Sequence, residues 1–205
     1  MIVIVNYGLG NLGSIHNMLR RIGAKNIVIS NEKEIINKAE KIILPGVGAF
    51  SNGMSKIMES GLLEVLNENV LIRKKPVLGI CLGMQLLTKH SDEGNVGGLG
   101  WIDAYTKKFN FSVENAGLKI PHMGWNEVSV SKPHALVQNL DNNSRFYFVH
   151  AYHVICNNSQ DELLKCNYGI DFTCALQYEN IMGVQFHPEK SHKFGMNLLR
   201  NFYTM

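Results

Sequence analysis

The chain has 205 residues, of which 45% are hydrophobic and 18% are charged, and its formal net charge is +3. This length allows one α/β domain with a full core and is short for two ordinary domains, so we expect a single domain over residues 1–205. The composition is that of an ordinary globular protein, and the small net charge does not indicate a nucleic-acid-binding surface.

The cysteines and histidines do not indicate a metal site. None of the four cysteines forms a C-x-x-C pair, and the histidines lack metal-ligand spacing, so we expect no metal, no disulfide framework and no cofactor. His150 and His153 would point to opposite faces of a regular strand. The apolar start at residues 1–5 lacks the basic residues of a secretory leader, and we therefore expect a cytoplasmic protein with no membrane anchor.

The first half of the chain alternates short apolar runs with helical patterns. Strands are predicted at residues 2–5, 27–29, 42–44 and 77–80, and helical spacing of apolar residues occurs at 15–22, at 51–70 with a break near Gly61, and from Leu82 onward. This order is typical of α/β folds with a parallel sheet.

A glycine-rich loop joins the first predicted strand to the first predicted helix. Gly8, Gly10 and Gly13 match the G-x-G-x-x-G fingerprint of dinucleotide-binding proteins, and Glu32 lies about 20 residues further on, as that fingerprint requires. A nucleotide-binding protein is therefore one alternative. The same glycines are also explained as turn residues, because glycine adopts positive φ angles without steric cost.

Cys81 lies at the corner between the strand at 77–80 and the helix that begins near Leu82. With Gly79 and Gly83 on either side, it is the cysteine counterpart of the G-x-S-x-G nucleophile elbow, in which a strained turn needs small neighbours. The free N–H groups at the start of the helix, Leu82 first, would face the sulfur and favour its thiolate. The alternative is an inert core cysteine, because cysteine is among the most buried residue types.

The loop after the third predicted strand, PGVG at 45–48, could serve such a nucleophile. It lies at the carboxyl end of a parallel strand, where open α/β sheets bind their ligands. Its glycines let backbone N–H groups approach a reacting oxygen, so the Val47 N–H is a candidate oxyanion donor beside that of Leu82. Taken alone, the loop could be a plain turn.

The predicted strand at 182–186 leads into His187 and Glu189, which could supply the base and its orienting group. Glu189 could hold one imidazole nitrogen while the other faces the thiol of Cys81. Taken alone, His187 could be a surface histidine and Glu189 a carboxylate in the first turn of a helix. Together with the elbow and the PGVG loop, these residues favour a Cys81–His187–Glu189 triad.

The second half of the chain is richer in strands. Residues 89–100 are predicted as a polar loop, and strands are predicted at 102–107, 127–130, 146–154, 173–177 and 182–186. No linker separates the halves. We therefore expect a βα half that carries the nucleophile and a β-rich half that covers the same site.

The motifs PGVGAF, GICLGMQ and HPE, in that order, resemble the class I glutamine amidotransferases over nearly the whole chain. The resemblance implies a three-layer, flavodoxin-like α/β fold with a mostly parallel central sheet and an additional β-rich portion. It also implies a Cys-His-Glu triad that hydrolyses glutamine, with glutamine held by Gly46, Gly48, Gln85, Glu93, His150, Ala151 and Tyr152. A free glutaminase would waste glutamine, so we expect the oxyanion loop to be mispositioned until a partner and its nucleotide substrate bind.

Three further segments, at 6–14, 120–127 and 147–152, resemble the glutaminase subunits of imidazole glycerol phosphate synthase. Those subunits form heterodimers with a TIM-barrel, HisF-like cyclase, and the resemblance implies a partner interface near Asn11 and Trp125. The other interpretations are a helix N-cap for Asn11 and core packing for Trp125. Asn6 and Ala151 depart from the family pattern, which usually has an acidic residue and Ser or Thr there.

Three alternatives remain open from the sequence. Related glutaminase subunits supply ammonia for the amidation of bacterial surface sugars, and the two departures are compatible with that role. The same triad could also serve a cysteine hydrolase, either a peptidase or a γ-glutamyl hydrolase. The glycine loop could mark a dinucleotide-binding oxidoreductase.

Overall fold

The computed structural model describes residues 1–112, 117–141 and 143–205. Its strands are β1 (Ile2–Val5), β2 (Ile27–Ser30), β3 (Lys41–Gly46), β4 (Val77–Cys81), β5 (His90–Ser91), β6 (Val96–Gly97), β7 (Ala104–Lys108), β8 (His122–Glu127), β9 (Ser129–Val130), β10 (Arg145–His150), β11 (Tyr152–Cys156), β12 (Glu162–Asn167), β13 (Asp171–Tyr178) and β14 (Ile181–Val184). Its α-helices are α1 (Leu12–Arg21), α2 (Lys33–Lys38), α3 (Phe50–Glu59), α4 (Leu63–Asn67), α5 (Leu82–Leu86) and α6 (His192–Thr204).

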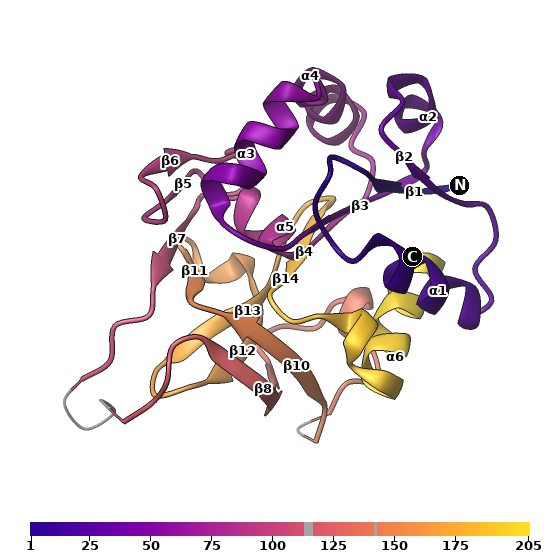
Figure 1. Ribbon diagram of the computed structural model, residues 1–205. Coiled ribbons are helices and arrows are strands. Elements are labelled where there is room, and N and C mark those ends of the chain that lie inside the picture. Colours follow the sequence, from indigo (N-terminus) through magenta and orange to yellow (C-terminus); the bar gives the residue numbers. More distant parts are fainter. Residues whose placement is uncertain (113–116, 142) are drawn as a thin grey trace.

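The parallel part of the main sheet has the strand order β2-β1-β3-β4-β14. Successive residues of a strand point to opposite faces, and both faces of these strands are covered. Ile4 packs with α1 and α6 residues in one core cluster, and Val3 packs with α2 and α3 residues in the other. Figure 1 shows the resulting layers, with α3 and α4 on one side of the parallel strands and α1 and α6 on the other.

The rest of the sheet is mostly antiparallel. It continues from β14 through β13, β11 and β7 to β5 and β6, while β12 pairs with β13 and β9. Strands β8 and β10 form a separate antiparallel pair in which Tyr147 lies opposite Trp125 and His150 opposite His122. The expected α/β fold with a parallel centre and an additional β-rich portion is confirmed.

The predicted strand at 146–154 is wrong in one respect that matters for the site. It is two strands, because the chain leaves the β8–β10 pair at His150, turns at Ala151 and enters the main sheet as β11. The backbone oxygen of Ala151 accepts a hydrogen bond from the Phe109 N–H at 3.1 Å. Because the strand is irregular, His150 and His153 both contact the Phe109 ring rather than lying on opposite faces.

Other boundaries also differ from the predictions. The polar loop at 89–100 contains the short strands β5 and β6, and the strand predicted at 127–130 is the end of β8 followed by β9. Strand β12 and helices α2 and α6 were not predicted. The break near Gly61 is confirmed, because α3 ends at Glu59 and Gly61 has a φ of 64°. No helix among the described residues is long and apolar enough to cross a membrane.

Candidate active site

The turn between β4 and α5 is a strained elbow. Cys81 has φ 54° and ψ −110°, a backbone conformation that is costly for any residue with a side chain. Both neighbouring glycines are required: a Cβ on Gly83 would lie 1.8 Å from the Leu44 oxygen, and one on Gly79 would lie 2.7 Å from the Gly83 oxygen. The predicted elbow is therefore confirmed in its geometry.

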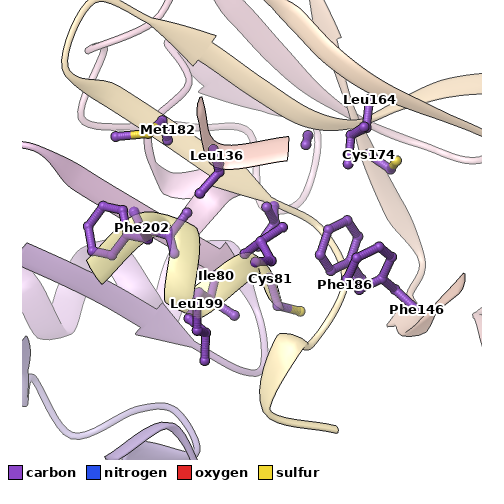
Figure 2. Packing of buried hydrophobic residues seen from close by; sticks show 14 of the residues in the cluster. Ile80, Cys81, Leu136, Phe146, Leu164, Cys174, Met182, Phe186, Leu199 and Phe202 are labelled. Carbon is purple, nitrogen blue, oxygen red and sulfur yellow. The ribbon is translucent and has the colours of Figure 1, made fainter. Parts of the chain in front are cut away.

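Cys81 is also a member of the hydrophobic core, with 7% of its surface exposed. Figure 2 shows it beside Ile80 in the cluster that includes the stacked rings of Phe146 and Phe186. Burial alone does not distinguish a nucleophile from a core cysteine. The positive φ and the cavity in front of the sulfur are features of a nucleophile elbow, because strained non-glycine residues concentrate at functional sites.

His187 and Glu189 form a buried pair beside this elbow. The Nδ1 atom of His187 lies 2.8 Å from Oε1 of Glu189, and the side chains are only 3% and 1% exposed. Burial alone would lower the pKa of His187, but its interactions with the nearby Cys81 sulfur and the Glu189 carboxylate outweigh it and raise the pKa to about 10. The imidazolium form is therefore favoured at neutral pH.

The second imidazole nitrogen of His187 is free for proton transfer. Its Nε2 atom is buried and has no hydrogen-bond partner within the described ranges, and Cys81 lines the same cavity. This leaves the proton on Nε2 available to a bound molecule, which is the arrangement that a general acid requires.

The turn that carries His187 is fixed to β10 through Ser191. The Ser191 hydroxyl donates to the His187 oxygen at 2.6 Å and accepts from the Tyr147 N–H at 3.0 Å. The His187 N–H in turn donates to the Tyr147 oxygen at 2.9 Å. The antiparallel pair β8–β10 thus positions the imidazole of His187 at the cavity that Cys81 of the parallel half also lines.

A cavity of about 300 Å³ lies in front of Cys81. It brings together most of the residues expected from the sequence, namely Val47, Gly48, Cys81, Leu82, Gln85, Glu93, His150, Ala151, Tyr152 and His187, with Pro121 and Val149 in addition. Gly46 is not part of this lining. It lies behind the wall, where a Cβ would be 2.5 Å from the Tyr7 hydroxyl.

The N-terminal glycine loop supports the loop at 45–48. The Tyr7 hydroxyl donates to the Pro45 oxygen at 2.5 Å, and a Cβ on Gly10 would lie 2.9 Å from Pro45. Burial, with a smaller contribution from the charge of Cys81, raises the pKa of Tyr7. Gly13, the third glycine of the fingerprint, has nothing within 4 Å of a built Cβ. The close helix packing that the dinucleotide fingerprint assigns to that glycine is therefore missing.

Glu93 and Gln85 are held at the cavity by backbone groups. Oε2 of Glu93 accepts from the Phe50 N–H at 2.8 Å, so this carboxylate lies at the N-terminus of α3, where negative charge is stabilised. Nε2 of Gln85 donates to the Tyr152 oxygen at 3.1 Å. The Gln85 contact fixes α5 against the corner of the chain at Ala151.

The far wall of the cavity rests on two buried histidines. His150 Nδ1 lies 2.7 Å from the Tyr152 oxygen and must donate to it, so His150 Nε2 accepts from His122 Nδ1 at 3.0 Å. Burial lowers the pKa of His150 to about 3 and that of His122 to about 4. Both rings are neutral at pH 7, as this hydrogen-bond pattern requires.

Sequence reasoning did not identify four residues of the site, Pro121, His122, Val149 and Gln185. Gln185 is fully buried, and its Nε2 atom lies 3.7 Å from the sulfur of Cys81. The signal for it was available, since Gln185 is a polar residue in an otherwise apolar strand directly before the HPE turn. No such signal marks His122.

The two residues expected at a partner interface, Asn11 and Trp125, have different surroundings. Trp125 is 43% exposed and stacks on His192 with ring centroids 5.4 Å apart, so its interpretation as a core residue is wrong. Asn11 occupies the N-cap position of α1, but its side chain makes no capping hydrogen bond. Among the described residues there is also no group of three or more His, Cys, Asp or Glu side chains that could hold a metal ion.

Comparisons with known proteins show the family and the fold of the chain. The family model for class I glutamine amidotransferases matches residues 3–205. The chain is 54% identical over 202 residues to imidazole glycerol phosphate synthase subunit HisH 2 of Methanococcus maripaludis, covering 98% of both chains. It is 51% identical over 205 residues to the protein of the same name from Pseudomonas aeruginosa, covering 100% of both. The solved structure of a putative GMP synthase subunit from Thermoplasma acidophilum has the same fold, with a TM-score of 0.71 and 21% identity over 99% of this chain and 92% of that chain.

Proposed function

The chain belongs to the class I glutamine amidotransferases, and we propose that it is the glutaminase subunit of an imidazole glycerol phosphate synthase. In this proposal, residues 1–205 form one glutaminase domain that hydrolyses glutamine and passes ammonia to a cyclase subunit of the TIM-barrel, HisF-like kind. The cyclase would make imidazole glycerol phosphate and AICAR in histidine biosynthesis. The observation that carries the activity is that Cys81 and His187 line one cavity, while Glu189 lies 2.8 Å from the Nδ1 atom of His187.

The first half of the reaction forms a thioester on Cys81. The thiolate attacks the side-chain carbonyl carbon of glutamine, the S–C bond forms, and the carbonyl oxygen becomes an oxyanion. The backbone N–H groups of Val47 and Leu82 would hold this oxyanion, and one such donor contributes about 3 kcal/mol. His187 gives its Nε2 proton to the amide nitrogen, the C–N bond breaks, and ammonia leaves.

The second half releases glutamate. Water attacks the thioester carbonyl carbon and gives a proton to His187, the C–S bond breaks, and the sulfur returns to a thiolate. Glu189 keeps the imidazole ring in one orientation throughout and stabilises the imidazolium. The balance is glutamine and water consumed, glutamate and ammonia produced, with the enzyme unchanged.

The remaining cavity residues would hold the amino-acid end of glutamine. The Glu93 carboxylate suits the α-ammonium group, and Gln85, Gly48 and the corner at residues 150–152 complete the pocket. The cavity of about 300 Å³ is at the small end of the range of ligand pockets, which suits a substrate of amino-acid size.

The partner would bind the outer face of the β8–β10 pair. Met123 and Trp125 on β8 are 65% and 43% exposed, and Val149 and Tyr147 lie opposite them on β10. Exposed apolar and aromatic groups of this kind are typical of interface anchors. Because Val149 also lines the cavity, this face adjoins the place where ammonia is formed. Asn11 would lie at its border, since α1 contacts α6, which begins at His192 beside Trp125.

A second candidate function is supply of ammonia to a different cyclase-like partner, for amidation of a bacterial surface sugar. The names of both relatives carry the number 2, from which we infer that their organisms hold a second copy. The acceptor binds to the other subunit, so the two roles share one glutaminase site. Ala151, where the family more often has Ser or Thr, is at the cavity in either case.

The test is reconstitution with purified partners. The chain is mixed with the cyclase encoded beside its gene or with the histidine-pathway cyclase of the same organism, and glutamine-dependent turnover of the ribonucleotide substrate is followed. Turnover with the histidine-pathway cyclase, with slow glutamine hydrolysis by the chain alone, is expected. Turnover only with a surface-sugar partner would favour the second function. Hydrolysis by the chain alone as fast as in the complex would contradict the expectation that the oxyanion loop depends on the partner.

A further inference from the structure

Gln185 is a fully buried amide in the short segment that joins β14 to the HPE turn. Its backbone N–H donates to the Cys174 oxygen at 2.8 Å, which fixes the residue to β13. Its side chain lies between Gln85 and Cys81, and both of its ends are used. Burying an amide costs free energy unless its polar atoms are hydrogen-bonded, and these two contacts meet that requirement.

The direction of the hydrogen bonds in this group is determined by a backbone carbonyl. The Tyr152 oxygen can only accept, so Gln85 presents Nε2 to it at 3.1 Å. The same Nε2 lies 3.0 Å from Gln185, so the Gln185 atom at that contact is Oε1. The amide nitrogen of Gln185 is therefore the atom that faces the sulfur of Cys81, at 3.7 Å.

We propose that Gln185 is a further catalytic residue, whose side-chain N–H donates a hydrogen bond to the sulfur of Cys81 and stabilises its thiolate. The proposal rests on the proposed function, in which Cys81 is the nucleophile. A charged acceptor strengthens a hydrogen bond roughly twofold over a neutral one, so the donor favours the thiolate over the thiol and the thioester. It assists at two points, in the resting enzyme and when the C–S bond breaks to release glutamate.

This arrangement also connects the sulfur to the substrate pocket. Gln85 lines the cavity and donates both to Gln185 and to the Tyr152 oxygen at the corner of the chain. A substrate that repositions Gln85 would change the contact between Gln185 and the sulfur. His187 also lines the cavity, in the turn after β14. The thiolate would therefore have two stabilising neighbours, the cationic imidazole of His187 and the neutral amide of Gln185.

The test measures alkylation of Cys81 by iodoacetamide, followed on the Cys81 peptide by mass spectrometry, with no glutamine and no partner present. Gln185→Met removes the donor and keeps a similar volume. Gln177→Met is the matched control, because the Gln177 amide donates to the Glu179 oxygen at 2.8 Å, away from the site. Gln185→Leu is a second variant of similar size that also lacks the donor. Thermal unfolding of each variant checks the fold.

Loss of one hydrogen bond to the charged sulfur reduces the thiolate population about tenfold at neutral pH. The thiolate that remains is about threefold more nucleophilic, because nucleophilicity rises with basicity. We therefore expect Gln185→Met to alkylate about threefold more slowly than the unmodified chain at pH 7, and this difference to narrow and then reverse as the pH is raised to 10. Gln185→Leu is expected to follow the same pattern, and Gln177→Met to match the unmodified chain at both pH values.

Two outcomes would overturn the proposal. Equal alkylation rates at both pH values in a folded Gln185 variant would mean that the amide does not act on the sulfur. Faster alkylation at both pH values would mean that the substitution only opens access to it. Neither outcome involves glutamine hydrolysis, so failure of this proposal is distinguishable from failure of the proposed function.

Discussion

The parallel strands and the antiparallel strands contribute to the candidate site in different ways. In the parallel half, Cys81 and the loop at 45–48 come from the carboxyl ends of the adjacent strands β3 and β4, and Gly46 pairs directly with Cys81. In the antiparallel half, the cavity wall comes from the corner at Ala151, where the chain passes from one sheet to another. The first arrangement follows from a general property of parallel sheets, whereas the second depends on the particular pairing of β8, β10 and β11.

The two halves also differ in how tightly their parts of the site are confined. The elbow is confined by backbone atoms on both sides, so it has one conformation. The β8–β10 pair is joined to the site through hydrogen bonds of Tyr147 and Ser191 and presents an exposed apolar face. A partner that binds this face can therefore act on the site without deforming the elbow.

The largest effect is expected from a methyl group in the elbow. Gly83→Ala would place Cβ 1.8 Å from the Leu44 oxygen, so we expect a loss of about 3 kcal/mol or more in the free energy of unfolding, measured by urea denaturation. Gly13→Ala is the matched control, because nothing lies within 4 Å of a Cβ there. In helix α1 it should stabilise by about 0.5–1 kcal/mol. A large loss of unfolding free energy in Gly13→Ala would instead indicate close packing at Gly13, as the dinucleotide fingerprint requires.

A smaller effect is expected from the exposed face of the antiparallel half. Trp125→Ala should weaken binding of the cyclase partner by about 2 kcal/mol, or roughly 30-fold, in calorimetric titration, because aromatic anchors dominate interfaces. The free energy of unfolding should change little, since Trp125 is 43% exposed. Tyr178→Ala, 45% exposed on β13, should leave the affinity unchanged. Equal affinity for both variants would place the interface elsewhere.

The smallest effect concerns the buried pair of His187 and Glu189. The pKa of His187 is raised to about 10, so its protonation stabilises the fold fully below about pH 6.5, and this stabilisation is lost as the pH rises through about 10. Glu189→Gln should therefore lower the free energy of unfolding by about 1–2 kcal/mol at pH 6, and the difference should shrink by pH 10.5. Glu179→Gln, at an exposed pair with Lys74, should show little change. A pH-independent difference would contradict the assignment of charge to His187.

Much of the parallel half could be predicted from the sequence because its signals are local. The apolar run before Cys81, the flanking glycines and the PGVG loop each specify their own conformation, and a parallel sheet brings its strand ends together. Asn11 and Gly46 show the limit of this reasoning. A helix N-cap position does not determine what its side chain contacts, and a glycine in a binding motif can lie behind the wall.

The antiparallel half could not be predicted in the same way, because its strands do not follow the usual pattern of buried apolar and exposed polar side chains. On β8, the polar His122 is buried, whereas Met123 and Trp125 face outward. Alternation of apolar and polar residues therefore indicates the wrong face for the core. The break at Ala151 has no glycine or proline to mark it, since it is caused by pairing with two different sheets. Such tertiary causes leave no local trace in the sequence.

In the proposed function, Cys81 releases ammonia from glutamine, and the ammonia is used in a reaction on the partner subunit. The most direct measurement compares the complex containing Cys81→Ala with the unmodified complex, with either glutamine or an ammonium salt as the nitrogen source. We expect Cys81→Ala to abolish glutamine-dependent turnover, by about 10⁴-fold or more, while ammonium-dependent turnover stays within about twofold. Glutamine-dependent turnover that survives the substitution would contradict the proposed function.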